Sequence, residues 1–222
     1  MLPYFTLFGH RFSTYYTMML AGFVFMLVLM LRRRSRYGLK AWQAVLFTVC
    51  VMFSGVLGCK VLYTLEHWGE PITLGGFSFF GAVFLVPPLM ALLGLPFRLR
   101  PGRSICAAAP CVNAMIGTIR VGCFFNGCCG GWATASGFIW PTQAAESIGD
   151  FVILWYLLRR EEAGERDLYP RFMVLYGALR FVVEFFRKAE PQTLFHAGHA
   201  LALLSVLIGL ACLYASRRRR AK

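Results

Sequence analysis

An arginine followed at once by glycine-broken, polar backbone stands near the middle of the chain. Arg120 ends an apolar segment, and residues 121–131 read Val-Gly-Cys-Phe-Phe-Asn-Gly-Cys-Cys-Gly-Gly. An arginine inside a membrane span costs about 2.5–3.5 kcal/mol on insertion scales, so its side chain should face a partner or water. Guanidinium binds phosphate through parallel N–H donors and keeps its charge when partly desolvated. Arg120 is therefore a candidate ligand for a phosphate.

A second group of charges lies in the apolar run 176–187. Arg180 and Glu184 are four residues apart and Arg187 follows three later, so the three side chains share one helical face. One interpretation is an Arg-Glu-Arg packing network in which Arg187 reaches the membrane interface. The other is that these arginines join Arg120 around the phosphate of a lipid. The second interpretation predicts one binding site built from two segments that are distant in sequence.

The glycines within 127–131 favour the phosphate site. Glycine lets the chain turn and brings backbone N–H groups close to a ligand, and irregular backbone at membrane depth survives where it lines a cavity. Asn126 has an amide that can donate to a phosphate or ester oxygen, or else cap the next turn. We expect Arg120, Arg180 and Asn126 to line one opening that reaches the lipid sideways.

Three of the eight cysteines lie in the same segment. Cys123, Cys128 and Cys129 match none of the usual zinc spacings, and no histidine is near them in sequence. They are expected to fill space in a loop, or to contribute one disulfide with Cys123 on an oxidising face. The sequence therefore predicts no metal and no cofactor. The other five cysteines lie in apolar runs, where a thiol packs as a small hydrophobe.

Composition indicates a membrane protein. Of 222 residues, 58% are hydrophobic and 15% are charged, against roughly 25% charged residues in a soluble domain. The net charge of +13 is compatible with nucleic acid or an anionic membrane surface as partner. The basic residues form short clusters between apolar runs, which is the pattern of a membrane protein and not of a nucleic-acid-binding protein.

The fold expected from this pattern is all-α: a polytopic membrane protein of about seven transmembrane helices in a single domain, residues 1–222. Seventeen of the 23 Lys and Arg lie in four segments that alternate with the other connections, which places the N-terminus outside and the C-terminus in the cytoplasm. These segments are 32–40, 98–103, 159–171 and 217–222. The expected spans are 12–31, 41–65, 75–97, 104–125, 143–158, 168–186 and 194–216.

Four motifs in this order resemble the prolipoprotein diacylglyceryl transferase family. They are Gly-Gly-Phe-Ser-Phe-Phe-Gly-Ala at 75–82, Arg-Val-Gly-Cys-Phe-Phe-Asn-Gly at 120–127, Pro-Thr-Gln at 141–143 followed by Glu146, and the run from Tyr176 to Arg187. Each motif is weak alone, but four in order within seven expected helices are specific. The resemblance extends from about Tyr15 to His199, which is nearly the whole chain.

The resemblance implies an enzyme of lipoprotein biosynthesis in the bacterial cell inner membrane, a multi-pass protein. It implies transfer of the diacylglyceryl group of phosphatidylglycerol to the lipobox cysteine thiol of a preprolipoprotein signal peptide, with release of glycerol phosphate. By motif position the catalytic residues are Arg120 and Arg180. The implied substrate-binding residues are Tyr15, Asn126, Gly127, Gly131, Glu184 and Arg187. Two fixed cations would stabilise charge developing on the leaving oxygen.

The chain departs from the family's pattern at positions that bear on proton transfer. Phe80 stands where the motif usually has histidine, and Trp140 stands where a histidine usually precedes Pro141. Cys123 and Cys128 replace an asparagine and an acidic residue. This is therefore a divergent member lacking the usual motif histidine, and the candidate replacement bases are Glu146, Glu184 and His199.

Two other functions stay open on the sequence. One is a diverged non-catalytic homologue that binds a phospholipid or a membrane partner. The other is a small transporter or thiol-redox membrane protein, suggested by the clustered cysteines. Activity and thiol content of the purified protein distinguish them.

Overall fold

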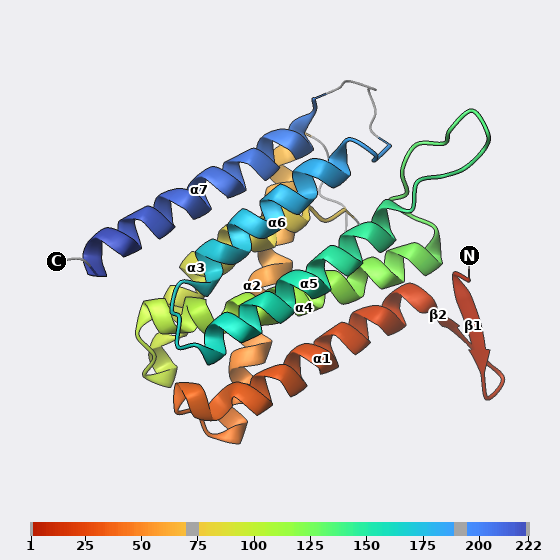
Figure 1. Ribbon diagram of the computed structural model, residues 1–222. Helices are drawn as coiled ribbons and strands as arrows, with labels where there is room; N and C mark the ends of the chain where they lie inside the picture. Colours follow the sequence, from red (N-terminus) through yellow and green to blue (C-terminus); the bar gives the residue numbers. More distant parts are fainter. Residues whose placement is uncertain (1, 70–75, 189–194, 221–222) are drawn as a thin grey trace.

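The computed structural model describes residues 2–69, 76–188 and 195–220, and within these ranges it is a bundle of seven α-helices (Figure 1). Residues 75 and 194, where two of the expected spans begin, lie outside the described part. The helices run in the order expected from the apolar runs. They are α1 Thr14–Tyr37, α2 Ala41–Glu66, α3 Phe79–Leu93, α4 Pro101–Asn126, α5 Thr142–Glu162, α6 Leu168–Glu184 and α7 Ala197–Arg220.

A small hairpin precedes the bundle, so the first expected span began too early. Strands β1 Tyr4–Leu7 and β2 His10–Ser13 pair antiparallel. Leu2 donates its N–H to the carbonyl oxygen of Phe125 at 3.0 Å, which fixes the N-terminal segment to the end of α4. The C-terminal end of α7 lies at the opposite end of the bundle (Figure 1).

The third expected span, 75–97, is interrupted in the structure. The helix α3 ends at Leu93, and a short 3-10 turn η1, Leu95–Phe97, follows it. Pro96 within this turn has no backbone N–H to continue the α-helical pattern. Gly58 of α2 and Gly81 of α3 bring the two helices into direct backbone contact, because a Cβ built on Gly81 would lie 2.0 Å from the Gly58 carbonyl oxygen.

Helix α4 is the centre of the bundle. It contacts α1, α2, α3, α5 and α6, and Ala107, Ala108 and Ala109 are fully buried in it. Small residues allow this close packing: a Cβ on Gly117 would lie 3.0 Å from Cβ of Asp150 in α5. The site-bearing end of α4 is therefore held by neighbours on every side.

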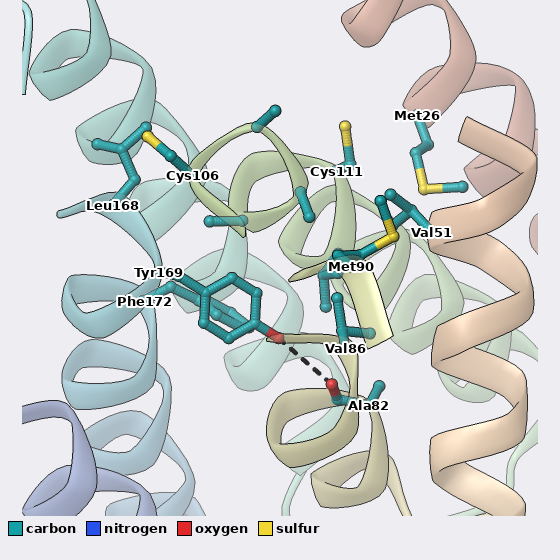
Figure 2. Close-up of a cluster of buried hydrophobic side chains, with 14 of the residues drawn as sticks. Met26, Val51, Ala82, Val86, Met90, Cys106, Cys111, Leu168, Tyr169 and Phe172 are labelled. Atoms are coloured by element: carbon teal, nitrogen blue, oxygen red, sulfur yellow. Dashed lines mark hydrogen bonds between the residues drawn. The ribbon is translucent and has the colours of Figure 1, made fainter. Parts of the chain in front are cut away.

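The apolar core lies where α1, α2, α3, α4 and α6 meet. Met26, Val51 and Met90 pack together from α1, α2 and α3 (Figure 2). Tyr169 of α6 is 1% exposed, and its hydroxyl donates to the carbonyl oxygen of Val83 at 3.1 Å. This hydrogen bond satisfies a polar group that would otherwise be costly to bury.

In the described part of the chain, four helices are long and apolar enough to cross a membrane. These are α1, α2, α4 and α7, and α3 is a shorter apolar helix. Glu146 and Asp150 place two carboxyl groups in α5, which makes it less apolar than these. The structure thus confirms an all-helical membrane protein, while crossing by all seven helices and the orientation of the termini stay predictions.

A buried charge network lies at the end of the bundle opposite the hairpin. Arg33 is 5% exposed, and its Nε donates to Oε2 of Glu161 in α5 at 2.7 Å. Tyr37 donates its hydroxyl to the same carboxylate. The run Arg32-Arg33-Arg34 reads as a uniformly exposed cluster, but only its middle residue points inward.

We expect Tyr37→Phe to lower the free energy of unfolding by about 1.5–3 kcal/mol, because a hydrogen bond to a buried charged group is lost. Tyr214→Phe is the matched control, since Tyr214 is 58% exposed and its loss of a hydroxyl should cost less than about 0.5 kcal/mol. Thermal or denaturant unfolding in detergent measures both. Equal stability of the two variants would contradict a supporting role for the Tyr37 hydroxyl.

Candidate functional site

Two arginines from distant segments meet on one carboxylate at the hairpin end of the bundle. Nε of Arg120, in the last two turns of α4, lies 2.9 Å from Oε1 of Glu146 in α5. Nη1 of Arg180 in α6 lies 2.9 Å from the other oxygen of the same carboxylate. The sequence indicated that Arg120 and Arg180 would converge, and the structure brings them together through Glu146.

This pair of cations is almost completely buried. Arg120 is 1% exposed, Glu146 2% and Arg180 5%. Buried charges are tolerated only when paired, and removal of one partner leaves the others uncompensated. Glu146 is therefore the residue that allows two guanidinium groups to be held side by side before any ligand arrives.

Aromatic rings lie against both guanidinium groups. The Arg120 guanidinium carbon lies 4.5 Å from the ring centroid of Phe79, and that of Arg180 lies 5.8 Å from the ring of Phe80. Such contacts stabilise a desolvated cation by about 0.5–2 kcal/mol. Phe80 is 4% exposed, so the residue that stands at the motif-histidine position here contributes a ring and no titratable group.

The ion-pair network continues to the end of α6. Glu184 pairs with Nη2 of Arg180 at 2.7 Å and with Nη1 of Arg187 at 3.8 Å. Arg180 and Glu184 therefore share one face of α6 as expected, whereas Arg187 lies beyond the end of the helix and reaches Glu184 from its bridge with Gly131. His196 adds a contact of 2.8 Å between its Nε2 and Oε1 of Glu184. Nothing in the sequence brings His196 next to Glu184, so this contact could not be predicted from it.

The glycine-rich segment forms a loop tied to α5 and α6. Gly127 has a φ of 77° and closes α4. Gly131 pairs with Arg187 in an isolated bridge, and a Cβ on it would lie 2.3 Å from the Phe186 carbonyl oxygen. Gly127 and Gly131 line a pocket of about 440 Å³ with Gln143 among others. Asn126 lies exposed at the end of α4.

An apolar pocket of about 640 Å³ lies on the other side of Phe79, between α1, α2, α3 and α4. Tyr15, the expected substrate-binding residue of α1, lines it together with Met19, Met52 and Ile119. Phe79 belongs to this pocket and also lies against Arg120. The structure thus places an apolar cavity next to the buried cations, with one aromatic ring between them.

Neither pocket is the opening that we expected to be lined by Arg120, Arg180 and Asn126. Neither lining includes the two arginines, because Glu146 and the rings of Phe79 and Phe80 occupy the space around their guanidinium groups. Asp150, one turn after Glu146, is a further fully buried carboxyl group. The sequence analysis did not predict a role for it.

The three loop cysteines are brought together. Their sulfur atoms all lie within 4.8 Å of one another. A hydrogen bond donated by the Cys123 thiol lowers the pKa of Cys129 to about 5; partial burial opposes this shift, and the charges of Arg187 and Arg120 add to it. Cys129 therefore has thiolate character, which is the reactive and metal-binding form of the residue.

Comparison with known proteins identifies the family of the chain. The family model for prolipoprotein diacylglyceryl transferase matches residues 3–215. The chain belongs to this family. Its sequence-based assignment is thus confirmed, and with it the assignment to a family of transferases.

The chain is similar over most of its length to several members of the family. It is 27% identical over 214 residues to phosphatidylglycerol–prolipoprotein diacylglyceryl transferase 2 of Clostridium perfringens, covering 84% of this chain and 82% of that protein. It is 28% identical to the transferase of Geobacter sulfurreducens, covering 98% and 96%. With the transferase of Pseudomonas aeruginosa it shares 30% identity, covering 77% and 74%. The family match therefore spans residues from all seven described helices.

Proposed function

We propose that this family member transfers the diacylglyceryl group of phosphatidylglycerol to the lipobox cysteine thiol of a preprolipoprotein, a step of lipoprotein biosynthesis that releases glycerol phosphate. The observation that carries the proposal is the buried Arg120–Glu146–Arg180 arrangement beside an apolar pocket. A phospholipid has the two matching parts, an anionic phosphate and apolar acyl chains.

The two arginines are the catalytic residues of the proposal. The sulfur of the acceptor attacks the diacylglyceryl carbon that is bonded to the phosphate oxygen, the bond from this carbon to that oxygen breaks, and the thiol proton is released to solvent. Negative charge then gathers on the departing phosphate oxygen. Fixed cations in a site without water stabilise this charge more than water does, and they need no reorganisation. Arg120 and Arg180 are fixed by Glu146 and by the rings of Phe79 and Phe80.

The substrate-binding roles follow the same geometry. Tyr15 lines the apolar pocket, where an acyl chain fits. Glu184 and Arg187 extend the charged row towards the loop, and Gly127 and Gly131 form the pocket wall on that side. The amide of Asn126 is exposed at the rim, within reach of a head group that enters from the membrane.

The proposal places this end of the bundle at the outer leaflet of the bacterial cell inner membrane. All seven helices cross, the N-terminus is outside and the C-terminus is cytoplasmic. This orientation is supported by the excess of Lys and Arg at the opposite end of the bundle. It also places the thiol acceptor, a preprolipoprotein with its lipobox cysteine, on the same side as the site.

The test is a transfer assay with the purified protein in detergent. Phosphatidylglycerol labelled in its head group is mixed with a synthetic lipobox peptide, or with the same peptide carrying serine in place of cysteine. We expect labelled glycerol phosphate to be released with the cysteine peptide alone, and that peptide to gain the mass of a diacylglyceryl group. Phosphatidylglycerol that is bound but never consumed would favour the non-catalytic homologue instead.

A further inference from the structure

The loop cysteines form a group that the ion-pair network does not use. Cys123 is at the end of α4 and is 2% exposed, Cys128 is half-buried and Cys129 is exposed. Their three sulfur atoms lie within 4.8 Å of one another. Thiolates around a tetrahedral zinc ion at about 2.3 Å lie about 3.8 Å apart. The longest sulfur pair therefore needs to shorten by no more than about 1 Å to hold one ion.

The backbone is built to keep these sulfurs together. Gly127 and Cys129 have φ values of 77° and 61°, so the chain reverses twice after α4 and returns Cys129 towards Cys123. A left-handed conformation is strained for a residue with a side chain, and such strain is kept where the surroundings determine it. Here Thr142 donates to the Cys129 carbonyl at 3.1 Å, and Gln143 donates to that of Cys128 at 2.7 Å.

The charges around the group suit an anionic metal complex. Three thiolates and one zinc ion carry a net charge of −1, which needs cations nearby. Arg187 and Arg120 act electrostatically on Cys129, and Cys129 lines the 440 Å³ pocket that also holds Gly131 and Lys188. Cys129 of the group is thus open to a pocket of the loop.

We propose that Cys123, Cys128 and Cys129 bind one zinc ion, and that its open fourth position takes the incoming acceptor thiol. The second half of this proposal rests on the transfer function proposed above. Three protein ligands with one open position is the arrangement of catalytic zinc sites, whereas structural sites are closed by four. The sequence expectation of no metal was drawn from spacing and a missing histidine, and a site made of three thiolates needs neither.

A zinc ion at this place would activate the acceptor thiol without the motif histidine. Phe80 replaces the motif histidine, while Glu146 and Glu184 are each held by two arginines. A thiol bound to zinc loses its proton outright, so no separate base is needed. The zinc-bound sulfur forms the new bond to the diacylglyceryl carbon as the bond from that carbon to the phosphate oxygen breaks. The electron pair of the broken bond leaves with the phosphate. The thiol proton is released to water.

The first experiment measures metal binding without reference to activity. The reduced protein in detergent is dialysed against Zn²⁺ with a competing chelator, and X-ray absorption reports the zinc–sulfur distance. We expect about one zinc per chain, with affinity lowered by about 100-fold or more in Cys128→Ser and in Cys129→Ser, which exceeds the roughly 10–100-fold effect of altering only a supporting residue. Cys212→Ser is the control, since Cys212 is exposed on α7.

Alkylation of accessible thiols provides a second measurement, which is available even if a variant does not fold. In the unaltered chain, zinc should protect Cys128 and Cys129 from alkylation and leave Cys212 reactive. The metal site would be overturned by zinc binding that is the same in the single variants and the unaltered chain. The metal site would also be overturned if the unaltered chain bound no more zinc than the triple variant Cys123→Ser/Cys128→Ser/Cys129→Ser.

The second experiment tests the open position. With Co²⁺ in place of zinc, the visible absorption should change when the lipobox cysteine peptide is added and stay unchanged with the serine peptide. A spectrum indifferent to both peptides would overturn the role of the fourth position. Binding of zinc and thiol without any transfer of the diacylglyceryl group would support the zinc site and overturn the proposed function, so the two failures are distinguishable.

Discussion

Arg120→Ala is expected to lower the rate of diacylglyceryl transfer by at least about 100-fold, because loss of one preorganised group that stabilises developing negative charge typically costs 10²–10³ in kcat. The Arg120 side chain is fixed by Glu146 at 2.9 Å and by the ring of Phe79. It therefore reaches the phosphate without paying for reorganisation. Rates of labelled glycerol phosphate release by purified variants measure the effect.

Two controls separate this chemical effect from damage to the fold. Arg120→Lys keeps the charge but loses the forked donor geometry, so we expect an intermediate loss that falls mainly on kcat. Arg100→Ala changes an exposed arginine at the opposite end of the bundle and should leave the rate unchanged. A rate for folded Arg120→Ala within a factor of two of the unaltered protein would remove Arg120 from the mechanism.

Glu146→Ala is expected to lower the free energy of unfolding by about 3–5 kcal/mol, the usual cost of leaving a buried charge without its partner. Both carboxylate oxygens of Glu146 are used, one by Arg120 and one by Arg180. Their removal leaves the buried Arg120 without its carboxylate partner and leaves Arg180 with its remaining ion pair to Glu184. Thermal unfolding in detergent measures the loss.

A bound phosphate supplies the missing counter-charge, so phosphatidylglycerol should restore more stability to Glu146→Ala than to the unaltered chain. Glu162→Ala is the matched control on the same helix. The side chain of Glu162 is 53% exposed and 4.0 Å from Arg159, and such surface pairs contribute about 0–1 kcal/mol. Equal losses in the two variants, or no added protection by the lipid, would contradict a phosphate site between the arginines.

The sequence determines the positions of the helices well where charge and hydrophobicity change together. Helices α2 and α6 begin at residues 41 and 168 as expected, because basic or acidic residues stop the apolar run there. Where a break is set by backbone chemistry inside an apolar run, as at Pro96, the run alone predicts too long a helix. The hairpin before α1 is likewise missed, because its strands are only four residues long and the expected span includes Phe12 and Ser13, which end β2.

The site was predictable in its cations and not in the groups that hold them. Arg120 and Arg180 are costly in a span and so reveal themselves by type. The role of Glu146 depends on how α4, α5 and α6 cross, which no local pattern contains. The same holds for Arg33, because its neighbours Arg32 and Arg34 are also arginines but are exposed. Cys123, Cys128 and Cys129 converge in a loop with left-handed backbone at Gly127 and Cys129, and their spacing had argued only against a metal site.

The claim on which the function depends is that Arg120 and Arg180 together hold the phosphate of one phospholipid. The direct measurement is the amount of phosphatidylglycerol retained by the purified chain and its variants, determined by mass spectrometry after the same wash. We expect retention by the unaltered chain and by Arg100→Ala, and at least a tenfold loss in Arg120→Ala and in Arg180→Ala alike. Undiminished retention in either of the last two, with the protein folded, would contradict the claim.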